Sequence, residues 1–547
     1  MRTLRLFLIL VVLAALPAAI AQQPADESAS VDKLFERWNS EATPGCAVAV
    51  ARDNRIILSR AYGMADLEFD IPNRPDTIFE AGSVSKQFTA GAIVLLSLQG
   101  KLSLTDDVRK YVPEVPDYGT PITIRHLMTH TSGLRDWGNV ASMAGWPRGM
   151  RVHTHAHVLD IVSRQSALNF TPGHEYSYSN TGFNLLAIIV DRVSGMSFAE
   201  FCKKNIFDPL GMTHTQWRDN FRRIVKNRSV AYQAAGSGFE INMPFENIHG
   251  NGGLLTTVGD LLRWTENLET GKLGGPAFLE AMHRQGQLNS GRQITYASGL
   301  QIVSLNGVPE ISHTGSTAGY RAFLGRYPKQ RMAVALLCNI GSVNPGNLGH
   351  QVANVFLRTS PPKPAVQKKI EVPLAELNAK AGLYRNSATG EPVRLIVAEG
   401  ALRLERGGAL RPLSPTEFGI GTEERRFRFE PMPGGSGMRF REALESGEDA
   451  VYEPVTEFAP TAADLAEYAG DYYSADAETT LSAAVEDGSL VLRRRPNSRI
   501  PLTVLYKDTF QSSLGLIRFR RGANGRVAEL SVREGRVYDM RFRRGVR

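Results

Sequence analysis

The chain has little cysteine and, after its first residues, no long apolar segment. Only three of its 547 residues are cysteine, namely Cys46, Cys202 and Cys338. Because they are scattered and odd in number, they do not predict a disulfide framework. Cys46 and Cys338 lie in apolar, strand-like runs, where we expect small buried hydrophobic side chains. The missing apolar segments exclude a transmembrane helix beyond the N-terminus.

The chain also lacks a strong charge of one sign. Its formal net charge is +8, and many arginines near the end alternate with apolar residues, as in Ile517-Arg518-Phe519-Arg520. That pattern is typical of a strand with one solvated face. Since no recognised module accompanies the basic residues, we expect no nucleic-acid partner.

The first residues form a distinct segment. Arg2 and Arg5 precede an apolar run from Leu6 to Ala15, and small residues follow up to Ala21. This order predicts a secretory signal peptide over residues 1–21, cut before Gln22. The protein would then be periplasmic or secreted, with no stable membrane anchor after cleavage. The alternative is a retained membrane anchor, for which the apolar run is short.

Residues 31–358 alternate between strand and helix patterns. Strand patterns stand at both ends of this region, and helix patterns fill the middle. The expected elements are a hairpin over 46–58, helices over Ser83–Leu98 and Gly182–Val193, a helix capped by Thr257, and strands over Tyr320–Tyr327 and Met332–Leu337. This order predicts one antiparallel sheet closed by both chain ends, with flanking helices, an α+β arrangement.

The remainder of the chain contains an internal repeat. A proline-rich linker is predicted over 359–373. Beyond it, residues recur at a constant offset of 88, as from Leu377 to Leu465 and from Tyr384 to Tyr472. Met438-Arg439-Phe440-Arg441 also recurs as Met540-Arg541-Phe542-Arg543. Short alternating strands broken by turns predict two small antiparallel β-barrel modules, 374–455 and 461–547.

Ser83-Val84-Ser85-Lys86 is the first candidate for catalysis. The serine stands where Ala81-Gly82 gives way to an apolar helix, so backbone N–H groups and the positive end of the helix dipole lie near it. Lys86 follows one helical turn later, on the same face. A poorly solvated lysine can lose its proton and act as a base. The alternative is a capping serine beside a solvated lysine.

Two further segments offer polar groups. Tyr178 and Asn180 follow a Pro-Gly turn and precede a buried helix; the tyrosine can exchange a proton, and the asparagine amide can bind a substrate amide. The segment His313-Thr314-Gly315-Ser316 follows an apolar strand. There we expect glycine to admit a substrate backbone, and the N–H groups of Ser316 and Ser83 to form an oxyanion hole. Alone, these segments are equally compatible with a packing tyrosine, a capping asparagine and a turn.

Together, Ser-x-x-Lys, Tyr-x-Asn and His-Thr-Gly resemble the motif set of the active-site serine penicillin-recognising enzymes. Residues 31–358 resemble class C β-lactamases, D,D-carboxypeptidases, D-aminopeptidases and related esterases. The supporting phrases are Leu127–Leu134, Ile206–Met212 and Gly252–Thr257. The resemblance implies acylation of Ser83 followed by hydrolysis, with Lys86 and Tyr178 moving protons. It also implies that Asn180, His313, Thr314, Gly315 and Ser316 hold the substrate. Which of Lys86 and Tyr178 deprotonates Ser83 stays open.

His313 stands where typical β-lactamases have a lysine that attracts a substrate carboxylate. A mostly neutral imidazole would attract it weakly, which favours neutral amides and esters over β-lactams. A histidine here and paired barrels resemble the D-aminopeptidases, as do Ser83–Ala90, Gly133–Asp136 and Ile248-His249. In those relatives the barrels pack on the catalytic domain and a loop helps shape the site.

No cofactor or metal is expected. His153, His155 and His157 alternate, but the helical pattern that follows would separate their side chains, so a metal site is the less favoured interpretation. For His249, bordering the active site and capping a turn are equally compatible with the sequence.

We therefore expect a secreted serine hydrolase acting on small amides, D-amino-acid peptides or carboxylic esters. The alternatives are a β-lactamase or D,D-carboxypeptidase, and a non-catalytic sensor of cell-wall fragments. The oligomeric state is not predicted by the sequence.

Overall fold

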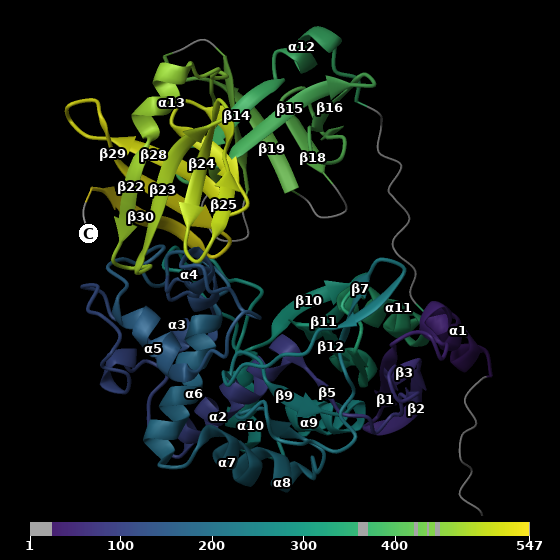
Figure 1. The fold of residues 1–547 in the computed structure, drawn as a ribbon. Coiled ribbons are helices and arrows are strands. Elements are labelled where there is room, and N and C mark those ends of the chain that lie inside the picture. Colours follow the sequence, from purple (N-terminus) through teal and green to yellow (C-terminus); the bar gives the residue numbers. More distant parts are fainter. Residues whose placement is uncertain (1–24, 359–369, 421–424, 435–436, 444–448, 546–547) are drawn as a thin grey trace, which may run out of the picture.

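A computed structural model describes residues 25–358, 370–420, 425–434, 437–443 and 449–545. The predicted signal peptide, residues 1–21, and most of the predicted linker lie outside the described residues. The remaining chain forms a larger domain, which contains the predicted catalytic residues, and two C-terminal barrel modules that lie side by side at one end of it (Figure 1). Among the described residues, no helix combines the length and the apolar character needed to cross a membrane.

A six-stranded antiparallel sheet forms the centre of the catalytic domain, in the order β10-β11-β12-β13-β1-β2. Its strands are β1 (Cys46–Arg52), β2 (Arg55–Tyr62), β10 (Gln301–Leu305), β11 (Val308–Thr317), β12 (Tyr320–Tyr327) and β13 (Met332–Cys338). Because β1 pairs with β13 over its whole length, the two ends of the domain close one sheet, as the sequence predicts. Short strands form small additional sheets. In these, β3 (Met64–Asp66) pairs with β4 (Ile71–Pro72), and β7 (Tyr232–Ala235) pairs with β8 (Gly238–Ile241). Strand β9 (Leu254–Thr256) lies between β5 (Phe79–Glu80) and β6 (Gln216–Trp217).

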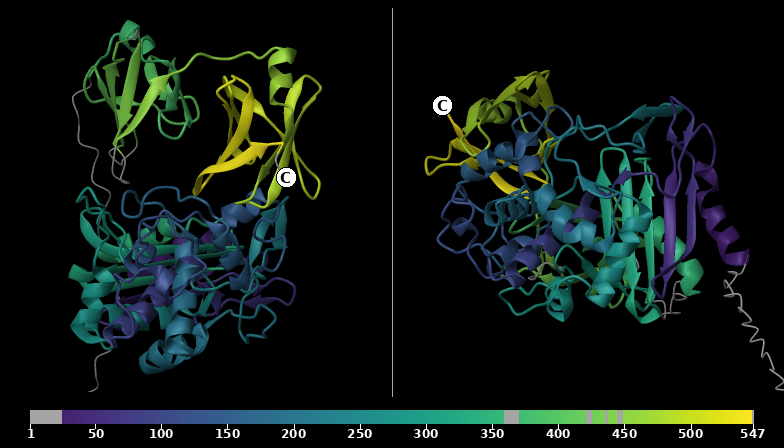
Figure 2. Two further views of the ribbon diagram at one scale, coloured as in Figure 1. Left: turned by 90° about the vertical axis from the view of Figure 1, so that its left-hand side faces the viewer. Right: turned by 90° about the horizontal axis from the view of Figure 1, so that it is seen from below.

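Helices cover both faces of the sheet (Figure 2). They are α1 (Ala25–Phe35), α2 (Lys86–Leu98), α3 (Ile124–Met128), α4 (Trp137–Met143), α5 (His155–Ser163), α6 (Asn180–Ser194), α7 (Phe198–Cys202), α8 (Asp208–Leu210), α9 (Val258–Thr270), α10 (Gly275–His283) and α11 (Pro345–Leu357). Shorter helical turns are η1 (Glu36–Trp38), η2 (Gly82–Ser85), η3 (Val108–Lys110), η4 (Lys203–Phe207) and η5 (Pro328–Gln330).

Strand β1 shows how the sheet divides two cores. Its alternate residues Cys46, Val48 and Val50 join the apolar cluster that contains α1 and α11. The intervening alanines face the larger cluster that contains α2 and α9. Successive strand residues point to opposite faces, so small alanines on one side leave room for the buried helix α2 against the sheet.

Local signals place several elements as predicted. Asp53 and Asn54, at φ 51° and 59°, make the turn between β1 and β2. The Thr257 side chain accepts a hydrogen bond from the Asp260 N–H at the start of α9. The helix predicted from Ser83 differs at its start: η2 forms a 3-10 turn over Gly82–Ser85, and α2 begins at Lys86.

Cys46 and Cys338 are buried in strands as predicted, but the expectation of unbonded side chains is wrong. Cys46 and Cys338 form a disulfide across paired positions of β1 and β13. They are 292 residues apart in sequence, and only the closure of the sheet brings them opposite each other. Cys202 is a buried free cysteine.

Each C-terminal module is one antiparallel sheet curled into a nearly closed barrel. The first has the order β16-β15-β14-β21-β20-β19-β18-β17 and the second β25-β24-β23-β22-β30-β29-β28-β27-β26. The first contains α12 (Leu374–Asn378), β14 (Gly382–Asn386), β15 (Pro392–Ala398), β16 (Ala401–Leu404), β17 (Arg411–Pro412), β18 (Glu417–Ile420), β19 (Arg425–Pro431), β20 (Met438–Glu442) and β21 (Ala450–Pro454). The second contains α13 (Ala462–Tyr468), β22 (Gly470–Ser474), β23 (Thr479–Glu486), β24 (Ser489–Arg494), β25 (Ser498–Pro501), β26 (Thr503–Tyr506), β27 (Thr509–Ser512), β28 (Gly515–Arg521), β29 (Val527–Glu534) and β30 (Val537–Arg544).

The repeat has a structural basis at the offset of 88. The Tyr384 hydroxyl donates to the Lys380 carbonyl at 3.0 Å, and the Tyr472 hydroxyl donates to the Tyr468 carbonyl at 2.8 Å. Each bond ties the first strand of a module to the end of its helix. The second sequence match is not equivalent, because β20 lies between β19 and β21, whereas β30 lies between β22 and β29. Both segments satisfy the same strand alternation, which explains their likeness.

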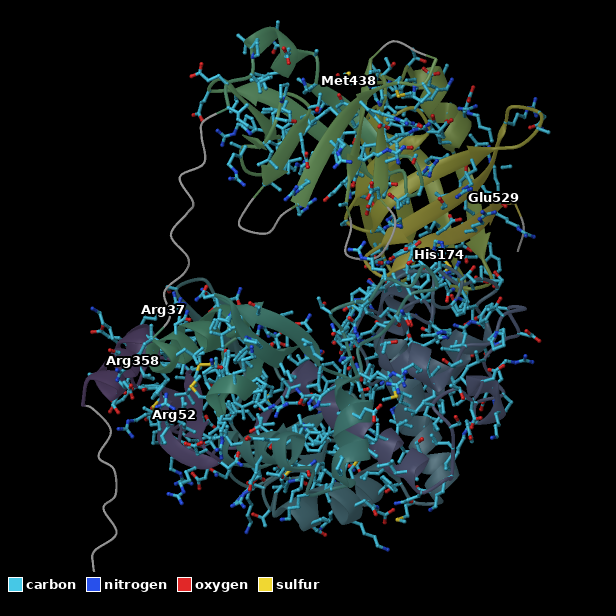
Figure 3. All side chains as sticks on the ribbon, turned by 180° about the vertical axis from the view of Figure 1, so that it is seen from behind. Arg37, Arg52, His174, Arg358, Met438 and Glu529 are labelled. Carbon is cyan, nitrogen blue, oxygen red and sulfur yellow. A yellow bond between two sulfur atoms is a disulfide. The ribbon has the colours of Figure 1, made fainter. Side chains whose placement is uncertain are left out.

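The second module packs on the catalytic domain near α4 (Figure 1). Arg135, with a side chain 4% exposed, forms an ion pair with Asp476 at 2.7 Å and donates to the Asp539 carbonyl at 2.8 Å. The Gln165 amide donates to the Asp476 carbonyl. Figure 3 places His174, in the loop that leads to Tyr178, at this boundary. The barrel therefore adjoins the segment that carries a predicted catalytic residue.

The disulfide gives a stability prediction. Replacing both Cys46 and Cys338 with alanine should lower the free energy of unfolding by about 2–4 kcal/mol, because the bond restricts a very long loop in the unfolded chain. Thermal melting of the oxidised protein with and without reductant measures the effect. The double variant is the control, since reductant should leave its melting temperature unchanged. Equal melting of oxidised and reduced wild type would contradict a stabilising bond.

Candidate active site

Ser83 and Lys86 meet where η2 leads into α2. The Lys86 Nζ lies 3.0 Å from the Ser83 Oγ, 3.0 Å from the Asn180 Oδ1 and 2.7 Å from the Asn251 carbonyl oxygen. A neutral amine has two N–H donors and one lone pair. It can therefore donate to the two carbonyl oxygens and accept the hydroxyl proton of Ser83.

The electrostatics favour that neutral form. Lys86 is 0% exposed, and burial lowers its pKa well below the ordinary lysine value. The positive charge of Arg536 lowers the pKa further, while the Asp136 carboxylate opposes the shift. Burial penalises an ammonium group that has lost its water. Burial thus favours the uncharged amine beside the serine hydroxyl.

Tyr178 stands in a loop held by His130. The Ser177 N–H donates to the His130 carbonyl at 2.9 Å, and the Ser179 N–H donates to the His130 Nδ1 at 3.2 Å. The rings of His130 and Tyr178 lie 4.1 Å apart, centre to centre. Burial raises the pKa of Tyr178, although its hydrogen bond with Ser83 and the charge of Arg536 act in the opposite direction. The phenol therefore keeps its proton at neutral pH.

Asn180 is the first residue of α6. Its backbone N–H donates to the Asp136 carboxylate at 2.7 Å, which fixes the start of the helix. Its side-chain oxygen accepts from Lys86, so Asn180 both lines the cavity and orients the lysine. Asp136 was not singled out from the sequence, because its effect on the site depends on the packing of α4 against α6.

Strand β11 carries the His-Thr-Gly segment. Thr314 and Ser316 are exposed on one side of the strand, and both line the cavity beside Ser83. His313 is buried: its Nδ1 donates to the Thr314 carbonyl at 2.6 Å, and its Nε2 accepts from the Tyr296 hydroxyl at 2.9 Å. Burial, assisted by the nearby Lys86, lowers the pKa of His313 to about 4. The histidine is therefore uncharged at neutral pH, as the sequence predicts.

Gly315 has a packing role that the sequence does not predict. It is buried, and a Cβ at this position would lie 2.0 Å from the Ala81 carbonyl oxygen. The absence of a side chain thus lets β11 pack against the segment that carries Ser83. Gly315 thus supports the segment that carries Ser83, and it is not among the residues that line the cavity.

A cavity of about 430 Å³ opens over these groups. Of the residues predicted from the sequence, Ser83, Tyr178, Asn180, His313, Thr314 and Ser316 line it. Arg148, Asn251, Gly252, Gln301, Thr317 and Arg536 also line it, with Gly82, and none of these was predicted. Arg536 comes from the second barrel module, and no local motif distinguishes it from the many arginines of that module.

The histidines considered as metal ligands do not form a site. Thr154 precedes α5, which begins at His155, and the His155 Nε2 lies 3.0 Å from the His249 carbonyl oxygen. His249 packs against Phe198, with ring centres 5.5 Å apart, and is not among the residues that line the cavity. Within the described part of the chain, no group of three or more His, Cys, Asp or Glu residues is arranged to hold a metal ion.

Comparisons with known proteins agree with the family that the three motifs indicate. The family model described as Beta-lactamase matches residues 27–353. The chain belongs to this family. It is 28% identical over 421 residues to penicillin-binding protein 4* of Bacillus subtilis, covering 70% of this chain and 90% of that protein. It is 29% identical over 366 residues to a D-aminopeptidase of Gluconobacter oxydans, covering 66% of each.

The structural similarity to known proteins extends beyond the catalytic domain. The octameric penicillin-binding protein homologue from Pyrococcus abyssi has a TM-score of 0.54 and 22% identity, and the match covers 86% of this chain and 98% of that one. The predicted family and fold, including the two barrels, are therefore confirmed. The β-lactamase-family chain is a serine hydrolase related to β-lactamases and penicillin-binding proteins.

The buried lysine predicts the pH dependence. We expect kcat/KM for 4-nitrophenyl butyrate to reach its plateau far below pH 10, because Lys86 must be uncharged to accept a proton and burial lowers its pKa. Activity is lost only as the pH falls through that lowered value. The profile, followed at the isosbestic wavelength of nitrophenol, measures this. A rise that continues to about pH 10 would show a lysine with its ordinary pKa.

Proposed function

We propose that this β-lactamase-family chain is an exported hydrolase that forms an acyl-enzyme at Ser83 with small amides, D-amino-acid peptides or carboxylic esters. The observation that carries this proposal is the fully buried Lys86, with its Nζ 3.0 Å from the Ser83 Oγ. The two neighbouring carbonyl oxygens take its N–H donors, so the remaining lone pair is directed to the serine proton.

In the first half of the reaction, Lys86 takes the Ser83 hydroxyl proton as the Oγ attacks the substrate carbonyl carbon. The backbone N–H groups of Ser83 and Ser316 stabilise the resulting oxyanion. The tetrahedral intermediate then expels its amine or alcohol, which receives a proton from Tyr178, and the Lys86 ammonium returns a proton to Tyr178. The products of this half are the acyl ester of Ser83 and the free leaving group.

Water completes the cycle. It adds to the acyl carbonyl carbon and gives its proton to the Lys86–Tyr178 pair, and the intermediate releases a carboxylic acid as the Ser83 Oγ regains a proton. All bonds and protons balance with water as the only co-substrate. The high pKa of Tyr178 suits a proton donor to the leaving group, whereas the low pKa of Lys86 suits the base.

His313 argues against a β-lactamase. Its two ring nitrogens are engaged by Thr314 and Tyr296, and its low pKa leaves it uncharged. It therefore supplies no cation on the strand where typical β-lactamases have a lysine. The similarity to the D-aminopeptidase of Gluconobacter oxydans supports an amide or ester substrate.

Export is part of the proposal. The basic, then apolar, then small-residue order of residues 1–21 supports a cleaved signal peptide. The Cys46–Cys338 disulfide adds support, since such bonds persist mainly in oxidising compartments.

The proposed roles predict the effects of three substitutions. Ser83→Ala should abolish turnover of 4-nitrophenyl butyrate, and Lys86→Ala or Tyr178→Phe should lower kcat by about a hundredfold or more. Combining all three should cost little beyond Ser83→Ala, because the groups act as a unit. Intact-protein mass spectrometry of a fluorophosphonate adduct at Ser83 is the direct check, and a chelator should leave activity intact. Turnover near wild type in Ser83→Ala would refute the assignment.

The substrate class can be compared in one panel. We expect turnover of 4-nitrophenyl butyrate, release of D-Ala from D-Ala-4-nitroanilide, and weak hydrolysis of nitrocefin, because position 313 provides no charge for the β-lactam. His313→Lys should raise nitrocefin turnover relative to ester turnover. Wild-type nitrocefin turnover far above ester turnover would instead indicate a β-lactamase.

A further inference from the structure

Two arginine side chains line the cavity over Ser83, although its histidine is uncharged. Among the described residues that line it, two are arginines, Arg148 and Arg536, and none is an aspartate or glutamate. The uncharged residue at position 313, taken alone, favours neutral substrates. The structure supplies permanent positive charge from other segments, on the Tyr178 side of the cavity.

Arg536 is held in place by the packing of the second module. It lies in the turn between β29 and β30, and Asn169 of the catalytic domain bonds to both sides of it: the Asn169 amide donates to the Arg536 carbonyl at 2.9 Å and accepts from the Tyr538 N–H at 3.0 Å. Gly535, at φ 51°, lies close to Asn139. A side chain at position 535 would crowd Asn139, so the close approach of the turn to the catalytic domain depends on glycine.

The guanidinium of Arg536 reaches the catalytic groups. Its Cζ lies 4.6 Å from the centre of the Tyr178 ring, and its Nη1 lies 3.4 Å from the Asp136 Oδ2. The side chain remains 40% exposed and lines the cavity. Arginine has five N–H donors, and one long ion pair occupies few of them. The contact with the Tyr178 ring orients the guanidinium of Arg536, and its other N–H groups remain as donors for a ligand.

Arg148 provides the second charge. It comes from the segment between α4 and α5, and its Nε and Nη2 donate to the Glu246 carboxylate at 3.0 Å and 2.6 Å. Its side chain is 39% exposed, whereas that of Glu246 is 5% exposed. The buried carboxylate thus orients Arg148, whose partly exposed side chain lines the cavity.

We propose that Arg536 is a specificity-determining residue, supplied by the C-terminal module, that binds a carboxylate of the substrate, with Arg148 as a second cation. Planar guanidinium groups match carboxylates in geometry, and such charge-assisted bonds are about twice as strong as neutral ones. The module thereby provides a cation over Tyr178, at a different place in the cavity from position 313 of β11. This inference rests on the proposed acyl-enzyme function and names its substrate class.

Matched esters test it. One pair places the charge in the acyl group: mono-(4-nitrophenyl) glutarate against 4-nitrophenyl pentanoate. The other places it in the leaving group: 4-acetoxybenzoate against phenyl acetate. For at least one pair, Arg536→Met should lower kcat/KM of the charged ester by about tenfold or more, as expected for a lost hydrogen bond to a charged group. The uncharged ester of that pair should change by less than about threefold.

Two variants control for other effects. Arg536→Lys keeps the charge and should recover part of the preference for the charged ester. Arg543→Met removes an arginine of the same module that is 76% exposed and should change neither ester. Melting temperatures verify that each variant is folded. Equal losses on charged and uncharged esters in both pairs would mean that Arg536 acts only on Tyr178 and Lys86, and would overturn the proposal.

A binding measurement separates this inference from the proposed function. Calorimetric titration of the two 4-nitrophenyl esters against Ser83→Ala requires no turnover, and so does titration of the other pair. Tighter binding of a charged ester, lost in the Ser83→Ala, Arg536→Met protein, would support the carboxylate site even if the wild type hydrolysed no ester. If neither charged ester binds more tightly than its uncharged partner, the carboxylate site is refuted, even where Ser83 is acylated.

Discussion

The geometry of the candidate active site depends on the burial of one amino group, that of Lys86. Lys86 is surrounded by protein, so its charged form is disfavoured, yet all three of its hydrogen-bonding positions are used, by Ser83, Asn180 and Asn251. Three segments position these groups: α2 begins at Lys86, α6 begins at Asn180, and the segment before β9 contains Asn251, whose carbonyl oxygen accepts from the lysine. An exposed lysine at the same distance from Ser83 would remain an ammonium, which has no lone pair to accept a proton.

The sequence predicts those parts of the fold that depend on neighbouring residues. The Asp53-Asn54 turn, the Thr257 cap and the strands β12 and β13 each follow from local sequence signals. The Ser83, Tyr178 and His313 motifs also lie together as expected, because each motif spans only a few residues with a specific role. The first turn at Gly82–Ser85 differs from the predicted α-helix, since the close contact with β11 tightens it.

Other features depend on tertiary contacts that no local pattern contains. Cys46 and Cys338 look like ordinary buried residues until the sheet closes. Gly315 resembles a substrate-binding glycine, but the neighbouring Ala81 carbonyl determines its role. Arg536 is one arginine among many in the second module, and only the docking of that module brings it over Tyr178. The sequence match between the segments at Met438 and Met540 arises because β20 and β30, which are not equivalent strands, both alternate apolar residues with arginines.

The pairing of β1 with β13 also constrains the order in which the chain acquires its structure. The hairpin of β1 and β2 consists of adjacent residues, but the other partner strand of β1 follows almost 300 residues later. Until then β1 presents an open edge with unpaired backbone groups, and such distant pairings form slowly. The two thiols come within bonding distance only when the sheet is complete. Formation of the Cys46–Cys338 bond therefore requires that the two ends of the domain have come together.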